Sequence, residues 1–187
     1  AVSGEKVYDS LFSLTDEALV SYDTNAKCNP PLRTKADIEA IKQGLVDGII
    51  DVIATDHAPH AREDKEVELQ DAAFGMVGLE TAVPLVITNL VKTGVMELGK
   101  AIAKLTIDPA RALGINAGTL AEGAPADITI IDTESVNVVR SSDFRSMGRN
   151  TPFEGFKLVG KVAATIVGGE IVHGAESLKA EEAKAGV

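Results

Sequence analysis

The sequence feature that most constrains the fold is a short apolar run, rich in β-branched residues, at residues 48–54. Only one polar side chain interrupts it, which is typical of a strand buried on both faces of a parallel sheet. Residues 35–47 carry apolar side chains at helical spacing and follow Thr34, a residue type that often caps helices. A helix followed directly by a buried strand predicts an α/β fold.

The composition limits the classes of protein that the chain can belong to. Its 187 residues, 45% of them apolar, suit one domain or one domain with a smaller piece of another. A net charge of −10 argues against a nucleic-acid or anionic-membrane partner, because phosphate groups would repel the surface. No run of eighteen or more apolar residues predicts a membrane span.

The single cysteine, Cys28, excludes an intrachain disulfide and fits a reducing compartment. The first residues lack the basic-then-apolar pattern of a secretory signal. We therefore expect a cytoplasmic location. As a candidate nucleophile Cys28 lacks a recognisable His-Asn partner order, so a structural role is favoured.

Beyond the predicted strand the pattern changes once. Helices are predicted at 79–92, at 97–105 and from Asp108-Pro109 to Gly114, with proline at the first helical position. From residue 118 onward, strands are predicted at 127–132 and 161–167, and Gly168-Gly169 indicates a hairpin leading to a further strand. We expect a division into residues 1–117, a β region at 118–174, and a tail at 175–187.

Asp56 directly follows the predicted buried strand, where α/β barrels place their catalytic groups. A carboxylate there can bind a metal and take the proton of a metal-bound water. His60, four residues later, could hold a substrate carboxylate. Alternatively, Asp56 caps the next segment and the histidines are ordinary loop residues. The residues alone support either interpretation.

Two further segments could contact a ligand. Asn29 and Arg33 lie on a loop stiffened by two prolines, a suitable place for groups that recognise a planar amide ring. Local evidence favours instead a structural loop in which Arg33 pairs with a surface carboxylate. Phe74-Gly75 would let the backbone approach a ligand closely, although local evidence favours a plain lead-in to the next helix. The charged stretch at 61–71 looks solvent-exposed and mobile.

The motifs together resemble those of dihydroorotases. Residues 54–60, followed after four intervening residues by Lys65, are similar to the second signature of that family. Residues 25–33 resemble its substrate loop, and residues 73–81 resemble its ring-contacting loop. Shorter matches follow in family order at residues 108–111, 118–120, 126–128 and 150–155. The resemblance spans roughly residues 14–174.

The resemblance implies a (β/α)₈ barrel with a zinc (Zn²⁺) site and an appended small β-sandwich. Residues 1–117 would then be the last strands and helices of the barrel, and residues 118–174 part of the β domain. It implies the reversible interconversion of N-carbamoyl-L-aspartate and L-dihydroorotate in pyrimidine biosynthesis. Asp56 resembles the metal-ligand aspartate that acts as general base and acid. Asn29 and His60 resemble substrate contacts, and Gly75 with Phe74 would offer backbone to the ring, whereas Arg33 matches a motif position without an assigned role.

Two departures from the family pattern concern the metal. The family's His-x-His motif is absent, because the three histidines are His57, His60 and His173. Where the family carries a Pro-His-His segment, residues 7–13 read Val-Tyr-Asp-Ser-Leu-Phe-Ser. A zinc site needs three or four ligands, and this chain offers one recognisable one. We therefore expect a carboxyl-terminal portion of the enzyme, inactive alone, that needs the missing barrel segment or a homo-oligomer.

Two alternatives remain. A related cyclic amidohydrolase, such as an allantoinase or hydantoinase, would share the fold, but such relatives usually lack the Asn29-type or the His60-type residue. A non-catalytic homologue could serve as a structural partner of aspartate carbamoyltransferase, which the altered segment at residues 7–13 would explain.

Overall fold

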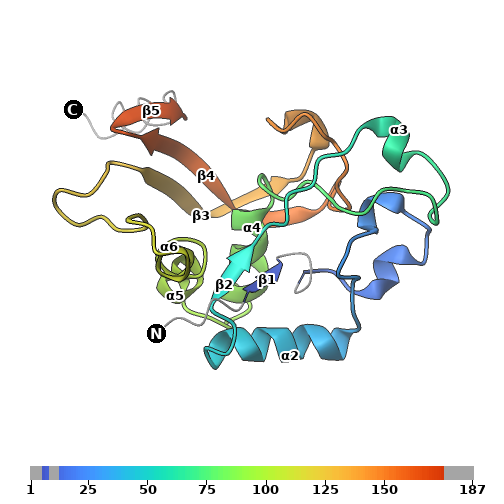
Figure 1. Cartoon of the computed structure of the whole chain (residues 1–187), viewed down its shortest axis with the longest axis horizontal. Helices are drawn as coiled ribbons and strands as arrows, with labels where there is room; N and C mark the ends of the chain where they lie inside the picture. The colour runs from blue at the N-terminus through green and yellow to red at the C-terminus, as the bar shows by residue number, and fades with distance from the viewer. Residues whose placement is uncertain (1–5, 9–12, 175–187) are drawn as a thin grey trace.

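Two short parallel strands form the centre of the fold. The computed structural model describes residues 6–8 and 13–174, so the predicted tail and most of the 7–13 segment lie outside the described residues. Strand β1 (Lys6–Tyr8) pairs in parallel with β2 (Val52–Ala54), with Lys6 opposite Val52 and Tyr8 opposite Ala54. Figure 1 shows α2 below this pair and α5 and α6 beside it.

The predicted strand at 48–54 is wrong in length, because β2 keeps only its last three residues. The chain first has to turn out of the preceding helix. Gly48 adopts a left-handed φ of 72°, and the N–H groups of Ile49 and Ile50 both donate to the carbonyl of Gly44 at 2.9 and 3.0 Å. These bonds close the helix end and leave Ile49 66% exposed.

Helix α2 (Lys35–Val46) begins where the sequence predicts. Thr34 accepts a hydrogen bond from the Asp37 N–H, and the Asp37 carboxylate accepts one from the Thr34 N–H. This reciprocal capping box satisfies two donors that the first helical turn would otherwise leave without partners. The helix buries Ile38, Gly44 and Leu45.

The later helices differ in detail from the prediction. The helix expected at 79–92 begins only at α4 (Ala82–Val86) and continues as the π-helical η3 (Ile87–Val91). After α5 (Leu98–Ala103), α6 (Ile107–Leu113) starts two residues before Pro109. The proline is still tolerated, because N–H groups of the first turn have no helical partner. None of the helices described here is long and apolar enough to cross a membrane.

A three-stranded antiparallel sheet of order β3-β4-β5 follows. It contains β3 (Ile128–Val138), β4 (Lys157–Val167) and β5 (Glu170–His173). The hairpin between β4 and β5 turns at Gly168-Gly169, as predicted. The first predicted strand is longer than expected, since β3 continues to Val138 beyond an irregularity after Asp132.

The remaining described elements are short: η1 (Asp16–Leu19), η2 (Thr24–Ala26), α3 (Arg62–Lys65) and η4 (Ser141–Asp143).

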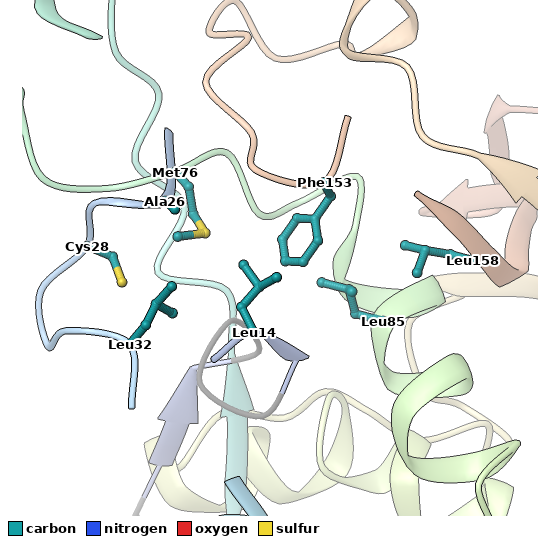
Figure 2. Close-up of a cluster of buried hydrophobic side chains, with 8 residues drawn as sticks. All are labelled: Leu14, Ala26, Cys28, Leu32, Met76, Leu85, Phe153 and Leu158. Carbon is teal, nitrogen blue, oxygen red and sulfur yellow. The ribbon is translucent and has the colours of Figure 1, made fainter. Parts of the chain in front are cut away.

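Two clusters of buried side chains hold these elements together. The first lies between α2, β2, η3 and α5, and its buried members are Leu45, Ile53, Val86, Leu90, Met96 and Ala101. The second, here called the loop cluster, joins segments far apart in the sequence: Leu14, Ala26, Cys28, Leu32, Met76, Leu85, Phe153 and Leu158. Figure 2 shows Leu14 and Phe153 in its middle, with Cys28 and Leu32 at one end and Leu158 at the other.

The antiparallel sheet is fixed to the helices by polar bonds as well as by the loop cluster. α4 and η3 pack against β4. The Thr88 hydroxyl accepts a hydrogen bond from the Val159 N–H at 2.8 Å and donates to the Val159 carbonyl at 3.3 Å. Gly160 lies so close to Ile87 that an added Cβ would approach within 3.0 Å of its side chain.

We predict that Phe153→Ala lowers the free energy of unfolding by about 3–5 kcal/mol, since Phe153 is 1% exposed and its removal leaves a cavity in the loop cluster. Urea unfolding of the purified chain measures the effect. Phe156→Ala is the matched control, because that ring is 43% exposed although it meets Phe153 edge-to-face at 5.7 Å. Equal losses in the two variants would contradict the prediction.

Candidate functional site

The candidate site begins where β2 ends. Asp56 follows that strand by two residues and is exposed, with a positive φ of 47°. Few residues other than glycine adopt this conformation, although aspartate tolerates it better than most. Such backbone strain often accompanies a functional position. The structure therefore places the predicted catalytic carboxylate in the open at the carboxyl end of a parallel strand.

The segment after Asp56 lies against residues 74–78. His57 and Met76 form an isolated parallel bridge, and the Ala58 N–H donates to the Met76 carbonyl at 2.9 Å. The Gly78 N–H donates to Nδ1 of His57 at 3.2 Å, which leaves the proton of a neutral His57 ring on Nε2. Gly78 permits this approach, because an added Cβ would lie 2.7 Å from the Thr55 carbonyl oxygen.

His60 and the Phe74-Gly75 pair are in direct contact. Nε2 of His60 lies 2.8 Å from the Phe74 carbonyl oxygen. A carbonyl only accepts, so Nε2 carries the proton and donates it. Gly75 has a φ of 123°, and an added Cβ would lie 2.5 Å from the Ala58 Cβ and 3.3 Å from His60 Nε2. Only glycine fits there without a collision with Ala58.

The loop that carries Asn29 meets the same place from the other side. The Gly75 N–H donates to the Lys27 carbonyl at 2.9 Å, and the Lys27 ammonium lies 4.4 Å from the centroid of the Phe74 ring. Asn29 follows two residues later with an exposed side chain. The segments of Asn29, His60, Phe74 and Gly75 are thus brought together.

Arg33 belongs to the same loop but is directed elsewhere. Its guanidinium lies 3.5 Å from the Asp37 carboxylate, and both side chains are largely exposed. This is the pairing with a surface carboxylate that local sequence evidence favoured. An exposed pair of this kind contributes little stability.

The prediction that the charged stretch at residues 61–71 is solvent-exposed is wrong for Lys65. Residues 62–65 form α3, and Lys65 is only 4% exposed. Its ammonium donates to the carbonyls of Ala73 at 2.8 Å and Gly75 at 3.0 Å. Burial lowers the pKa of Lys65, against the opposing attraction of Asp23. The reason for the burial is that the carbonyls of Ala73 and Gly75 face inward and need hydrogen-bond donors.

Asn150 is a site neighbour to which sequence reasoning assigned no role. It is 5% exposed and lies in the loop between β3 and β4. Its Oδ1 accepts the His60 N–H at 3.0 Å, and its Nδ2 donates to the carbonyls of Ala58 and Gly75 at 3.0 and 3.2 Å. The only available signal was its place in the motif at residues 150–155.

Cys28 lies in the loop cluster, and its Sγ lies 3.3 Å from the Pro30 carbonyl oxygen. Burial raises the pKa of its thiol, and the nearby negative charge of Asp56 raises it further. A thiol held protonated is a poor nucleophile. The structure thus agrees with the structural role expected for Cys28.

The described residues do not by themselves fit a zinc site. Among them, no group of three or more histidine, cysteine, aspartate or glutamate side chains is placed to hold a metal ion. Asp56 is the one predicted ligand in the described part, whereas a zinc ion needs three or four. No chemical step is therefore derived through a metal from this chain.

Comparison with known proteins settles the family. Residues 8–172 match the amidohydrolase family. The chain belongs to the amidohydrolase family. The α/β fold predicted from the helix–strand order is that of this family.

Curated relatives within the amidohydrolase family confirm the resemblance to dihydroorotases. The chain is 58% identical over 161 residues to the dihydroorotase of Pelotomaculum thermopropionicum, and 53% identical over 161 residues to that of Acetivibrio thermocellus. Each alignment covers 86% of this chain but 38% of the relative. The chain therefore spans well under half the length of the dihydroorotases that it matches.

Solved structures of amidohydrolases show the same fold. The L-hydantoinase (dihydropyrimidinase) from Arthrobacter aurescens superposes with a TM-score of 0.84 at 31% identity, over 89% of this chain and 38% of that one. The D-hydantoinase (dihydropyrimidinase) from a Thermus species gives 0.80 at 22% identity over the same shares, which is evidence for the fold alone.

We predict that Gly75→Ala destabilises the chain by about 1–3 kcal/mol more than Gly94→Ala does. Both glycines have positive φ, but an added Cβ at Gly94 meets nothing within 4 Å, whereas at Gly75 it collides with Ala58. Urea unfolding measures both variants. An equal loss in the two would show that the contact with Ala58 relaxes without cost.

The lowered pKa of Lys65 predicts that the free energy of unfolding depends on pH. Because its folded pKa lies below the unfolded value, the unfolded chain binds more protons, and stability rises with pH through that window. The neutral amine still has two N–H donors for Ala73 and Gly75. The free energy of unfolding of the unchanged chain should therefore rise relative to that of Lys65→Met as the pH rises toward the ordinary lysine pKa of about 10.4.

Urea titrations at about pH 7 and about pH 10 measure the difference. Lys100→Met, at an exposed position, is the control and should show no comparable rise. A constant difference between the unchanged chain and Lys65→Met would contradict the assignment.

Proposed function

We propose that this chain is the part of a zinc-dependent dihydroorotase that carries the catalytic aspartate and the substrate loops. The reaction would be the reversible cyclisation of N-carbamoyl-L-aspartate to L-dihydroorotate. The observation that supports it best is the convergence of three segments beside the end of β2, namely residues 27–29, 56–60 and 74–75. The identity of 48–58% to curated dihydroorotases supports the same reaction over its superfamily relatives.

The roles proposed for the residues follow from their positions. Asp56 is the general base and acid, because its carboxylate is exposed at the strand end. His60 would hold the substrate carboxylate as a doubly protonated ring, donating Nδ1–H to it, since Nε2–H is already bonded to Phe74. Asn29 is exposed on the adjoining loop and would contact the same substrate. Gly75 and Phe74 line the place where the ring would lie.

The domain assignment belongs to this proposal. Residues 1–117 would supply the last strands and helices of a (β/α)₈ barrel, residues 118–174 part of a small β-sandwich, and residues 175–187 a tail. Asp56 would be one zinc ligand, and the other ligands would come from barrel residues outside this chain. The match to only 38% of each relative supports this division of the metal site. Completion by a homo-oligomer, and a partnership with aspartate carbamoyltransferase, stay predictions.

A hydantoinase-type or allantoinase-type activity is the second candidate. It is favoured by the superposition on the L-hydantoinase from Arthrobacter aurescens, at 31% identity. The presence of both Asn29 and His60 favours dihydroorotase, because the resemblance associates that pair with the dihydroorotase substrate.

A chimaera tests the proposal. The matching 161 residues of the Pelotomaculum thermopropionicum dihydroorotase are replaced by the corresponding residues of this chain. We expect turnover of dihydroorotate and not of hydantoin or allantoin, in steady-state assays with zinc. The isolated chain with added zinc should turn over none of them. Activity of the chimaera on hydantoin alone would refute the dihydroorotase assignment.

In the chimaera, Asp56→Asn should lower kcat by roughly 100- to 10,000-fold, because an amide cannot take up or return the proton. Asp71→Asn, at an exposed position away from these contacts, is the control and should keep the activity. Retention of full activity by Asp56→Asn would contradict the catalytic role.

A further inference from the structure

We propose that Asn150 is a positioning residue whose carboxamide sets the spacing between His60 and Gly75, and with it the affinity for substrate. This inference rests on the proposed function, because it concerns the same two substrate contacts. It adds a role for the loop between β3 and β4, which reaches the site from a distant part of the chain. Asn150 is 90 residues from His60 and 75 from Gly75 in sequence.

The carboxamide of Asn150 joins both substrate segments at once. Its oxygen accepts the His60 N–H at 3.0 Å. One of its two N–H groups reaches the Ala58 carbonyl at 3.0 Å and the other the Gly75 carbonyl at 3.2 Å. The backbone carbonyl of Asn150 also accepts the Val77 N–H at 2.9 Å. One residue thus bonds to the signature segment and to the ring-contacting segment.

Only a primary amide of this length supplies that pattern. The site requires one acceptor facing an N–H and two donors facing carbonyls, in a place that is 5% exposed. An aspartate would set a carboxylate oxygen against carbonyl oxygens and lose both donors. The approach is also tight, because an added Cβ on Gly148 would lie 2.7 Å from the Pro59 Cβ and 2.8 Å from Asn150 Oδ1.

The bonds act on the proposed substrate contacts and not merely on the core. Gly75 is held by Lys27 through its N–H and by Lys65 and Asn150 through its carbonyl. Lys65 bonds to the carbonyls of Ala73 and Gly75, whereas Asn150 bonds to both the Gly75 carbonyl and the His60 N–H. Without Asn150, His60 is linked to the Phe74-Gly75 segment by the Nε2–H bond to the Phe74 carbonyl.

The loss of Asn150 should therefore appear in substrate binding. His60 and Gly75 are proposed to hold the substrate, while Asp56 transfers the proton. Displacing the holding groups weakens binding in ground and transition states alike, which raises KM and leaves kcat nearly unchanged. A variant that only lowers the amount of folded enzyme does the opposite, lowering kcat per total protein at constant KM.

The experiment compares Asn150→Ala and Asn150→Asp with Asn137→Ala and Asn137→Asp in the chimaera. Asn137 is a matched control, because its Nδ2 also donates to two backbone carbonyls, those of Ser135 and Gly160, but within the sheet. We expect KM for dihydroorotate to rise about 10- to 100-fold in the Asn150 variants, with kcat changed by less than about threefold, because the lost hydrogen bonds weaken binding in ground and transition states alike. The Asn137 variants should keep the KM of the parent.

A second measurement uses the 187-residue chain itself. In ¹⁵N-labelled protein, Asn150→Ala should shift the backbone amide signals of His60 and Gly75 and speed their hydrogen exchange, whereas Asn137→Ala should leave both signals in place. This readout does not depend on turnover, so it separates the two proposals.

Each outcome decides one of the proposals. An unchanged KM, or a fall in kcat alone, in the Asn150 variants would overturn the positioning role. If the parent chimaera does not turn over dihydroorotate, the proposed function fails. The amide signals then decide whether Asn150 positions the two loops, and unshifted signals at His60 and Gly75 overturn that role too.

Discussion

Burial of the loop cluster is the constraint on which the rest of the structure depends. Leu14, Cys28, Met76 and Phe153 come from four segments that share no hydrogen-bonded sheet, and they meet around one apolar centre. Irregular backbone cannot hold its own position as a helix does, so the loops beside β2 rely on this shared burial. The polar bonds between them form because the apolar side chains already bring the loops into contact.

Hydrogen bonds in the site then fix the relative positions of the loops that the loop cluster brings into contact. His60 bonds to the carbonyl of Phe74, and Gly75 is bonded through both its N–H and its carbonyl. Buried hydrogen-bond donors and acceptors without partners lower the stability of the fold. This explains why Lys65 and Asn150 are buried and bond to the carbonyls of these loops. A site held this way is preorganised, and Asp56 stays exposed at its edge.

Much of the fold could be predicted, and the failures have definite causes. The Thr34 cap of α2 and the turn at Gly168-Gly169 depend on neighbouring residues, so local chemistry predicted both. The strand at 48–54 was predicted too long, because burial periodicity does not reveal that Gly44 closes the helix end over Ile49. The charged stretch around Lys65 was misinterpreted, because a lysine usually lies in solvent unless distant carbonyls require it.

The sequence by itself determined the family motifs, the α/β order, and the residue types at Asp56, His60 and Gly75, because each of these depends on residues adjacent in the chain. Only the tertiary structure decided that Asn150 bonds to His60 and Gly75. The physical reason is that hydrogen bonds across 75 to 90 residues depend on where folding brings two backbones together. No spacing or periodicity encodes that meeting.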